Sequence, residues 1–75
     1  MSNRLPQPKA RDITKTLEKL GFYEVRQKGS HRCFKHRDGR FTLVLIHSGE
    51  DISRGLLRQI LREIEITPKE FIEYL

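Results

Sequence analysis

The sequence has a single cysteine, no tryptophan and no long apolar run. Cys33 cannot form an internal disulfide, and secreted domains of this size usually need such cross-links. A membrane-spanning helix needs roughly 20 apolar residues in succession, which the sequence does not offer. The first ten residues include Arg4, Pro6, Pro8 and Lys9 without an apolar stretch, unlike a signal peptide. These absences predict a cytoplasmic protein.

Common catalytic and metal-binding motifs are also absent. We find no phosphate-binding glycine loop, no Gly-x-Ser-x-Gly elbow and no His-Glu-x-x-His helix. The remaining candidates are His31, Cys33, His36 and His47. On an extended strand His31 and Cys33 point to one face and His36 to the other, so their spacing disfavours zinc binding. We expect no metal and no cofactor, and we expect Cys33 to pack at or near the sheet core instead of acting as a nucleophile.

The positive charge is concentrated in the first half of the chain. The net charge is +5, but residues 1–40 carry +7 and residues 41–75 carry −2. Such an imbalance favours a polyanionic partner, because cationic side chains that neutralise phosphates release counterions. With 75 residues the chain is long enough for one compact domain. We expect a flexible segment over residues 1–8 and a single domain over residues 9–75.

Hydrophobic periodicity predicts a helix followed by three strands. Ile13, Leu17 and Leu20 recur at helical spacing after Lys9, and Gly21 supplies a C-terminal stop. Strands are predicted over 22–28, 31–36 and 41–46. The turn at 28–30 and the Asp-Gly pair at 38–39 would join them as an antiparallel meander.

The last third of the sequence predicts two more helices. After a polar loop at 47–51, apolar residues at 56, 57, 60, 61 and 64 trace an amphipathic helix capped near Ser53. Thr67, Pro68 and Glu70 then mark the start of a short final helix. The order α-β-β-β-α(-α) predicts a two-layer α+β sandwich with its helices on one face of a three-stranded antiparallel sheet. Double-stranded-RNA-binding domains share this order of elements.

His31 is the candidate catalytic residue. It follows Gly29 and Ser30 at a turn, where glycine lets the backbone approach a ligand. A neutral imidazole can take the proton of a ribose 2′-hydroxyl, which then attacks the adjacent phosphorus. Lys28 and Arg32 would offset the charge of the transition state. The side chains expected to hold RNA phosphates are those of Arg26, Lys28, Arg32 and Lys35.

Residues 21–36 read Gly-Phe-Tyr-Glu-Val-Arg-Gln-Lys-Gly-Ser-His-Arg-Cys-Phe-Lys-His, and they closely resemble the core of the HicA (YcfA-like) toxins of HicA–HicB toxin–antitoxin systems. The resemblance extends over residues 9–72, with departures at Leu45 and Leu56. It implies a ribosome-independent mRNA endonuclease on a fold similar to double-stranded-RNA-binding domains. The family's catalytic histidine falls on His31, with Gly29 and Ser30 shaping the active site. The implied partner is a HicB-like antitoxin.

Two other functions remain open from the sequence. The chain could be a non-catalytic RNA-binding module of the same fold. Alternatively, its main role could be assembly with an antitoxin into a DNA-bound repressor. We favour a metal-independent endoribonuclease that uses His31, mostly because of the resemblance to the HicA toxins, with the basic first half as the surface that would dock the RNA.

Overall fold

The computed structural model describes residues 7–46 and 52–75. Along the chain the elements are α1 (Ala10–Lys19), β1 (Tyr23–Lys28), β2 (His31–Lys35), β3 (Phe41–Leu45), α2 (Arg54–Ile64) and α3 (Pro68–Tyr74). The predicted α+β order is confirmed. Among these helices none is both long and apolar enough to cross a membrane.

Local capping signals set the helix boundaries. Gly21, with φ of 97°, donates its N–H to Glu18, and Phe22 donates its N–H to the Leu17 carbonyl, so α1 ends in a Schellman motif. The Ser53 hydroxyl accepts the Leu56 N–H and begins α2, as predicted. At the start of α3 the predicted capping box is present between Thr67 and Glu70.

The end of α2 carries a conformational strain that the sequence does not reveal. Glu65 adopts the left-handed conformation, with φ of 61°, at a position where glycine is usual. The next residue, Ile66, donates its N–H to the Leu61 carbonyl and closes the last turn. The tertiary packing of α2 must offset the cost of the left-handed residue, which is about 1–2 kcal/mol for a side chain with a Cβ.

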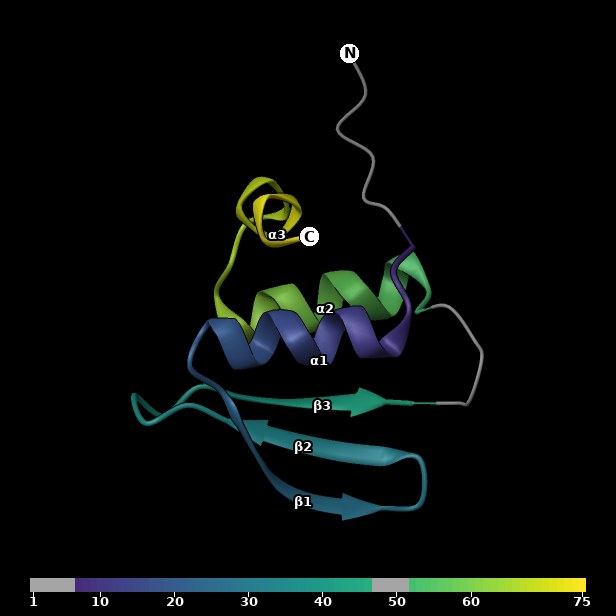
Figure 1. The fold of residues 1–75 in the computed structure, drawn as a ribbon, viewed down its shortest axis with the longest axis vertical. Helices are drawn as coiled ribbons and strands as arrows, with labels where there is room; N and C mark the ends of the chain where they lie inside the picture. Colours follow the sequence, from purple (N-terminus) through teal and green to yellow (C-terminus); the bar gives the residue numbers. More distant parts are fainter. Residues whose placement is uncertain (1–6, 47–51) are drawn as a thin grey trace.

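The strands form one antiparallel sheet in the order β1-β2-β3. Figure 1 shows α1 and α2 beside β3, while β1 lies farthest from the helices. All six residues of β1 are accordingly exposed, whereas β3 buries Thr42 and Val44. The helices therefore cover one face of β2 and β3, and the opposite face of the sheet is open.

The core lies between the covered face of the sheet and the helices. Its largest fully buried side chains include Phe34 from β2 and Phe71 from α3. Phe22, predicted as the first residue of β1, instead precedes the strand and is buried in this core. Pro8 is also buried, and its carbonyl accepts the Ile52 N–H over 2.8 Å. Residues 1–6 of the predicted N-terminal segment lie outside the described part of the chain.

One polar contact ties α2 to the covered face of the sheet. The Thr42 hydroxyl, which is fully buried, donates a hydrogen bond of 2.7 Å to Glu63 Oε1. A buried hydroxyl costs free energy when it has no partner, because it has lost its hydrogen bonds to water. The carboxylate at the edge of α2 removes that cost.

Removing the acceptor of this bond should destabilise the fold more than removing the donor. Glu63→Ala leaves the buried hydroxyl unpaired, and we expect it to lower the free energy of unfolding by about 1–3 kcal/mol. Thr42→Val removes the hydroxyl with similar shape and should change stability by less than about 1 kcal/mol. Urea denaturation of both variants tests this. In a Thr42→Val background Glu63→Ala should have little effect; an equal loss in both backgrounds would contradict the assignment.

Candidate active site

His31 opens β2 directly after the turn that joins it to β1. Gly29 in that turn has φ of 58°, and a Cβ placed on it would meet no atom within 4 Å, so the turn is open to solvent. The carbonyl of Ser30 accepts the Ile46 N–H over 2.7 Å, which fixes the turn against the end of β3. The His31 side chain is exposed. The His31 backbone is paired with β1 on one side and with β3 on the other, while its imidazole is accessible to a ligand.

The register of the strands shows which residues share a face of the sheet with His31, because directly paired residues project from the same face. One row contains Lys28, His31 and Leu45, a second contains Arg26, Cys33 and Leu43, and a third contains Tyr23, Lys35 and Phe41. We call these nine residues the open face. Their neighbours Phe34, Thr42 and Val44 project to the opposite, covered face.

A β-bulge in β1 decides which residues of that strand join the open face. Glu24 pairs with Phe34 and Arg26 pairs with Cys33, so Val25 is an extra residue without a partner in β2. Strict alternation would place Tyr23 with Val25 and Gln27. The bulge instead brings Arg26 and Lys28 to the face that carries Tyr23. This irregularity has no clear signal in the sequence.

The predicted phosphate-binding residues therefore divide between two faces. Arg26, Lys28 and Lys35 lie on the open face with His31. Arg32 alternates to the other face, where its Nε donates to Glu24 Oε1 over 2.9 Å and its guanidinium forms an ion pair with that carboxylate. Its Cζ also lies 5.6 Å from the centroid of the Phe34 ring. The structure thus gives Arg32 a place in the packing around Phe34, away from His31.

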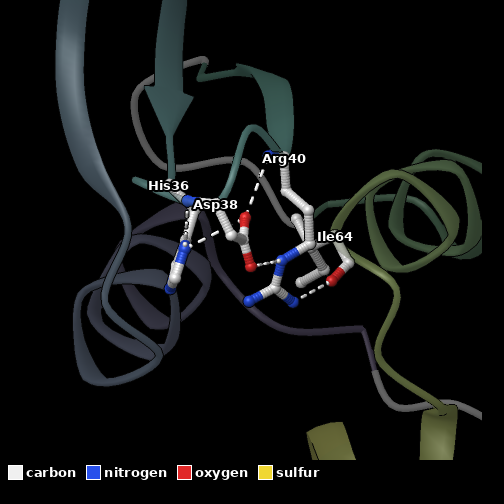
Figure 2. A network of polar contacts seen from close by, with 4 residues as sticks. All are labelled: His36, Asp38, Arg40 and Ile64. Atoms are coloured by element: carbon white, nitrogen blue, oxygen red, sulfur yellow. Dashed lines mark hydrogen bonds and ion pairs between the residues drawn. The ribbon is translucent and has the colours of Figure 1, made fainter.

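His36 lies beyond the opposite end of β2, in the turn toward β3. Figure 2 shows it in a network with Asp38, Arg40 and Ile64. Its Nδ1 accepts the Asp38 N–H over 3.1 Å and lies 3.0 Å from Asp38 Oδ1, a contact that becomes an ion pair when the imidazole is protonated. The ring also packs edge-on against Phe22, with 5.0 Å between centroids. His36 therefore stabilises the hairpin and does not join His31.

Asp38 and Arg40 connect this hairpin to α2 (Figure 2). Arg40 Nε donates to Asp38 Oδ2 over 2.9 Å, and Arg40 Nη1 donates to the Ile64 carbonyl over 2.5 Å. The Ile64 carbonyl is at the C-terminus of α2, where a cation is favourable. The hydrogen bond from the Arg40 backbone N–H is the largest cause that lowers the pKa of Asp38 below the ordinary value of 3.8. Desolvation opposes it, and the Arg40 guanidinium and the charge of His36 lower the pKa further.

The remaining candidates are Cys33 and His47. Cys33 is a free, partly exposed thiol in the centre of the open face. The prediction that it packs at or near the core is corrected in this respect: alternation along β2 gives the core position to Phe34. Within residues 7–46 and 52–75, no three His, Cys, Asp or Glu side chains are grouped as a metal site requires. His47 lies outside the described residues.

A family model described as the HicA toxin of bacterial toxin–antitoxin systems matches residues 10–66. The chain belongs to the HicA toxin family. The match spans α1, the whole sheet and α2, and so includes every residue of the open face. HicA toxins as a family are ribonucleases that pair with HicB antitoxins. The comparison with curated proteins gives no match.

Loss of the Asp38 charge should destabilise this HicA chain in a pH-dependent way. Asp38→Asn is expected to lower the free energy of unfolding near neutral pH. Because the pKa of Asp38 is lowered in the folded state, the stability it contributes is present above pH 3.8 and is lost as the pH falls through the folded value. The difference between wild type and variant should therefore shrink below that pH.

Urea denaturation followed by circular dichroism at a series of pH values measures this difference. Glu73→Gln, which removes an exposed carboxylate on α3, is the charge-matched control. A wild type that keeps its full advantage over Asp38→Asn below the folded pKa would contradict the role of the Asp38 charge.

Proposed function

We propose that this chain is an mRNA endonuclease toxin that cleaves RNA without a metal and without the ribosome, with His31 as general acid and base. The observation that carries the proposal is the exposed imidazole of His31 directly opposite Lys28 on an open, cationic surface. Membership of a family of ribonuclease toxins supports it. The proposed site of action is the cytoplasm, where mRNA is found.

The chemistry requires a proton acceptor and a cation beside the scissile phosphate. In the proposed reaction the neutral His31 ring takes the proton of a ribose 2′-hydroxyl, and the 2′-oxygen forms a bond to the adjacent phosphorus. The bond from phosphorus to the 5′-oxygen breaks, and the protonated ring returns its proton to that oxygen. The products are a 2′,3′-cyclic phosphate and a 5′-hydroxyl.

Lys28 is placed to stabilise the charge that develops on the phosphate. Directly paired residues of antiparallel strands have Cα atoms about 4.5–5.5 Å apart, so a Lys28 ammonium can reach an anion held at the His31 ring. Gly29 and Ser30 shape the entrance, because the open turn at Gly29 leaves room for the RNA backbone beside His31. The proposal assigns Arg26 and Lys35 to phosphates farther along the strand.

The proposed partner is a HicB-like antitoxin that blocks His31. An exposed catalytic group on a small, open surface can be inhibited by covering it, and no conformational change of the toxin is needed. The proposed complex would suppress cleavage for as long as the antitoxin is bound.

Replacement of His31 should abolish cleavage and leave the fold intact. Because general acid–base catalysis contributes about 10²–10⁴-fold, His31→Ala should lower the cleavage rate of an unstructured RNA by at least about 100-fold. The assay uses purified protein in excess EDTA, with analysis of the new ends for a cyclic phosphate. Binding of a 2′-O-methyl oligonucleotide, which lacks the nucleophile, and the thermal melting curve should be nearly unchanged.

His36→Gln is the matched histidine control, because His36 lies away from the open face, and it should retain cleavage. Wild-type protein that binds RNA without cutting it would indicate a non-catalytic binding module. Wild-type protein that acts only on operator DNA with an antitoxin would indicate a repressor subunit. Either result, or cleavage that persists in His31→Ala, would disprove the proposed function.

Loss of the Lys28 charge should slow the chemical step more than it weakens binding. Lys28→Gln is expected to lower kcat by about tenfold or more, since a donor aimed at developing charge acts mainly in the transition state. Lys69→Gln on α3 removes the same charge far from the sheet and should leave kcat unchanged. Equal effects of the two substitutions would show that only the net charge of the protein matters.

A further inference from the structure

The end of the open face farthest from His31 carries two exposed aromatic rings. Tyr23 is 49% exposed and Phe41 is 48% exposed. Both residues pair with Lys35, one from each neighbouring strand. Strands in a sheet lie about 4.8 Å apart, so the Cα atoms of Tyr23 and Phe41 lie about 10 Å apart, with that of Lys35 between them.

The charge around these rings favours an anionic ligand. The third row contains Lys35 and the second contains Arg26, while the open face has no carboxylate among its residues. Glu24 is the only acidic residue in β1, β2 and β3, and it faces the other way in its ion pair with Arg32. A protein partner would gain affinity by burying the apolar area of the rings, but it would also have to accommodate the cations beside each ring.

Unpaired nucleic acid has both features that this surface matches. Its phosphates are attracted to Lys and Arg, and its bases stack on aromatic rings when they are not paired in a duplex. In one common RNA-binding module, aromatic rings exposed on a β-sheet stack on the bases of single-stranded RNA. Large apolar side chains gathered on the surface of a small domain also indicate an interaction site.

We propose that Tyr23 and Phe41 stack on two unpaired bases of the RNA substrate, while Lys35 holds the phosphate between them. This inference rests on the proposed function. From His31 to Lys35 the strand rises about 13 Å, so the stacked bases lie away from the bond that is cut. The rings therefore select unpaired RNA and increase the affinity of the protein for it, and they take no part in the cleavage step.

Binding of a 2′-O-methyl oligonucleotide, measured by fluorescence anisotropy, tests the rings separately from cleavage. Tyr23→Leu and Phe41→Leu keep apolar bulk but remove the stacking surface. Each should weaken binding about fivefold or more, the lower limit expected for loss of one stacked base. Binding of an abasic oligonucleotide of equal length should not change. With cleavable RNA, KM should rise while kcat stays within about twofold.

Three control variants keep the test specific. Tyr23→Phe and Phe41→Tyr retain a ring at each position and should bind like wild type. Tyr74→Leu removes an exposed ring on α3, outside the sheet, and should also bind like wild type. Melting curves of all variants establish that they fold.

Unchanged oligonucleotide binding in both leucine variants would overturn the inference, even if the wild type cleaves RNA through His31. Equal weakening of abasic and normal oligonucleotides would overturn it too, because stacking would then not be the cause. Leucine variants that bind RNA normally but no longer bind the antitoxin would assign the rings to a protein interface instead. A wild type whose binding depends on the rings, but which cuts no RNA in EDTA, would support the inference and refute the proposed nuclease.

Discussion

The arrangement of this protein depends on the register with which β2 is paired between β1 and β3. Each residue of β2 has a partner on both sides, and these pairs decide which side chains enter the core and which face solvent. Phe34 is drawn to the covered face by the apolar area it buries against the helices. Because side chains alternate between the two faces along a strand, His31 and Lys35 must then project to the open face. A shift of one residue would bury the histidine and expose the phenylalanine.

The two ends of β2 differ in how they are attached to the rest of the domain. At the His31 end, the Ser30 carbonyl accepts the Ile46 N–H just beyond β3, and the open turn leaves the imidazole accessible. At the His36 end, side chains tie the hairpin to the C-terminus of α2 through Asp38 and Arg40. These contacts attach the hairpin to the helix layer. The open end can therefore present polar groups without carrying the packing of the domain.

The two faces of the sheet also divide the core from the proposed RNA-binding surface. Core side chains lie on the covered face, while the open face keeps its cations and aromatic rings in contact with solvent. In a chain of 75 residues few other surfaces are available for this division, because the helices must cover one side of the sheet to bury a core at all. Substitutions on the open face can therefore test the proposed RNA binding with little effect on folding.

The amino-acid sequence by itself determined the helices, the strands and the position of the candidate histidine. Gly21, Ser53 and the Thr67–Glu70 capping box act through hydrogen bonds within a few residues, so their effect can be read locally, and the family motif around Gly29, Ser30 and His31 is contiguous. Pairing between strands decided the rest. The bulge at Val25 selects Arg26 and Lys28 for the open face. Alternation along β2 places Arg32 on the face opposite to His31, and the pairing of β1 with β2 gives it Glu24 as an ion-pair partner there. The bulge and the ion pair depend on residues in neighbouring strands, so the periodicity of one segment cannot predict them.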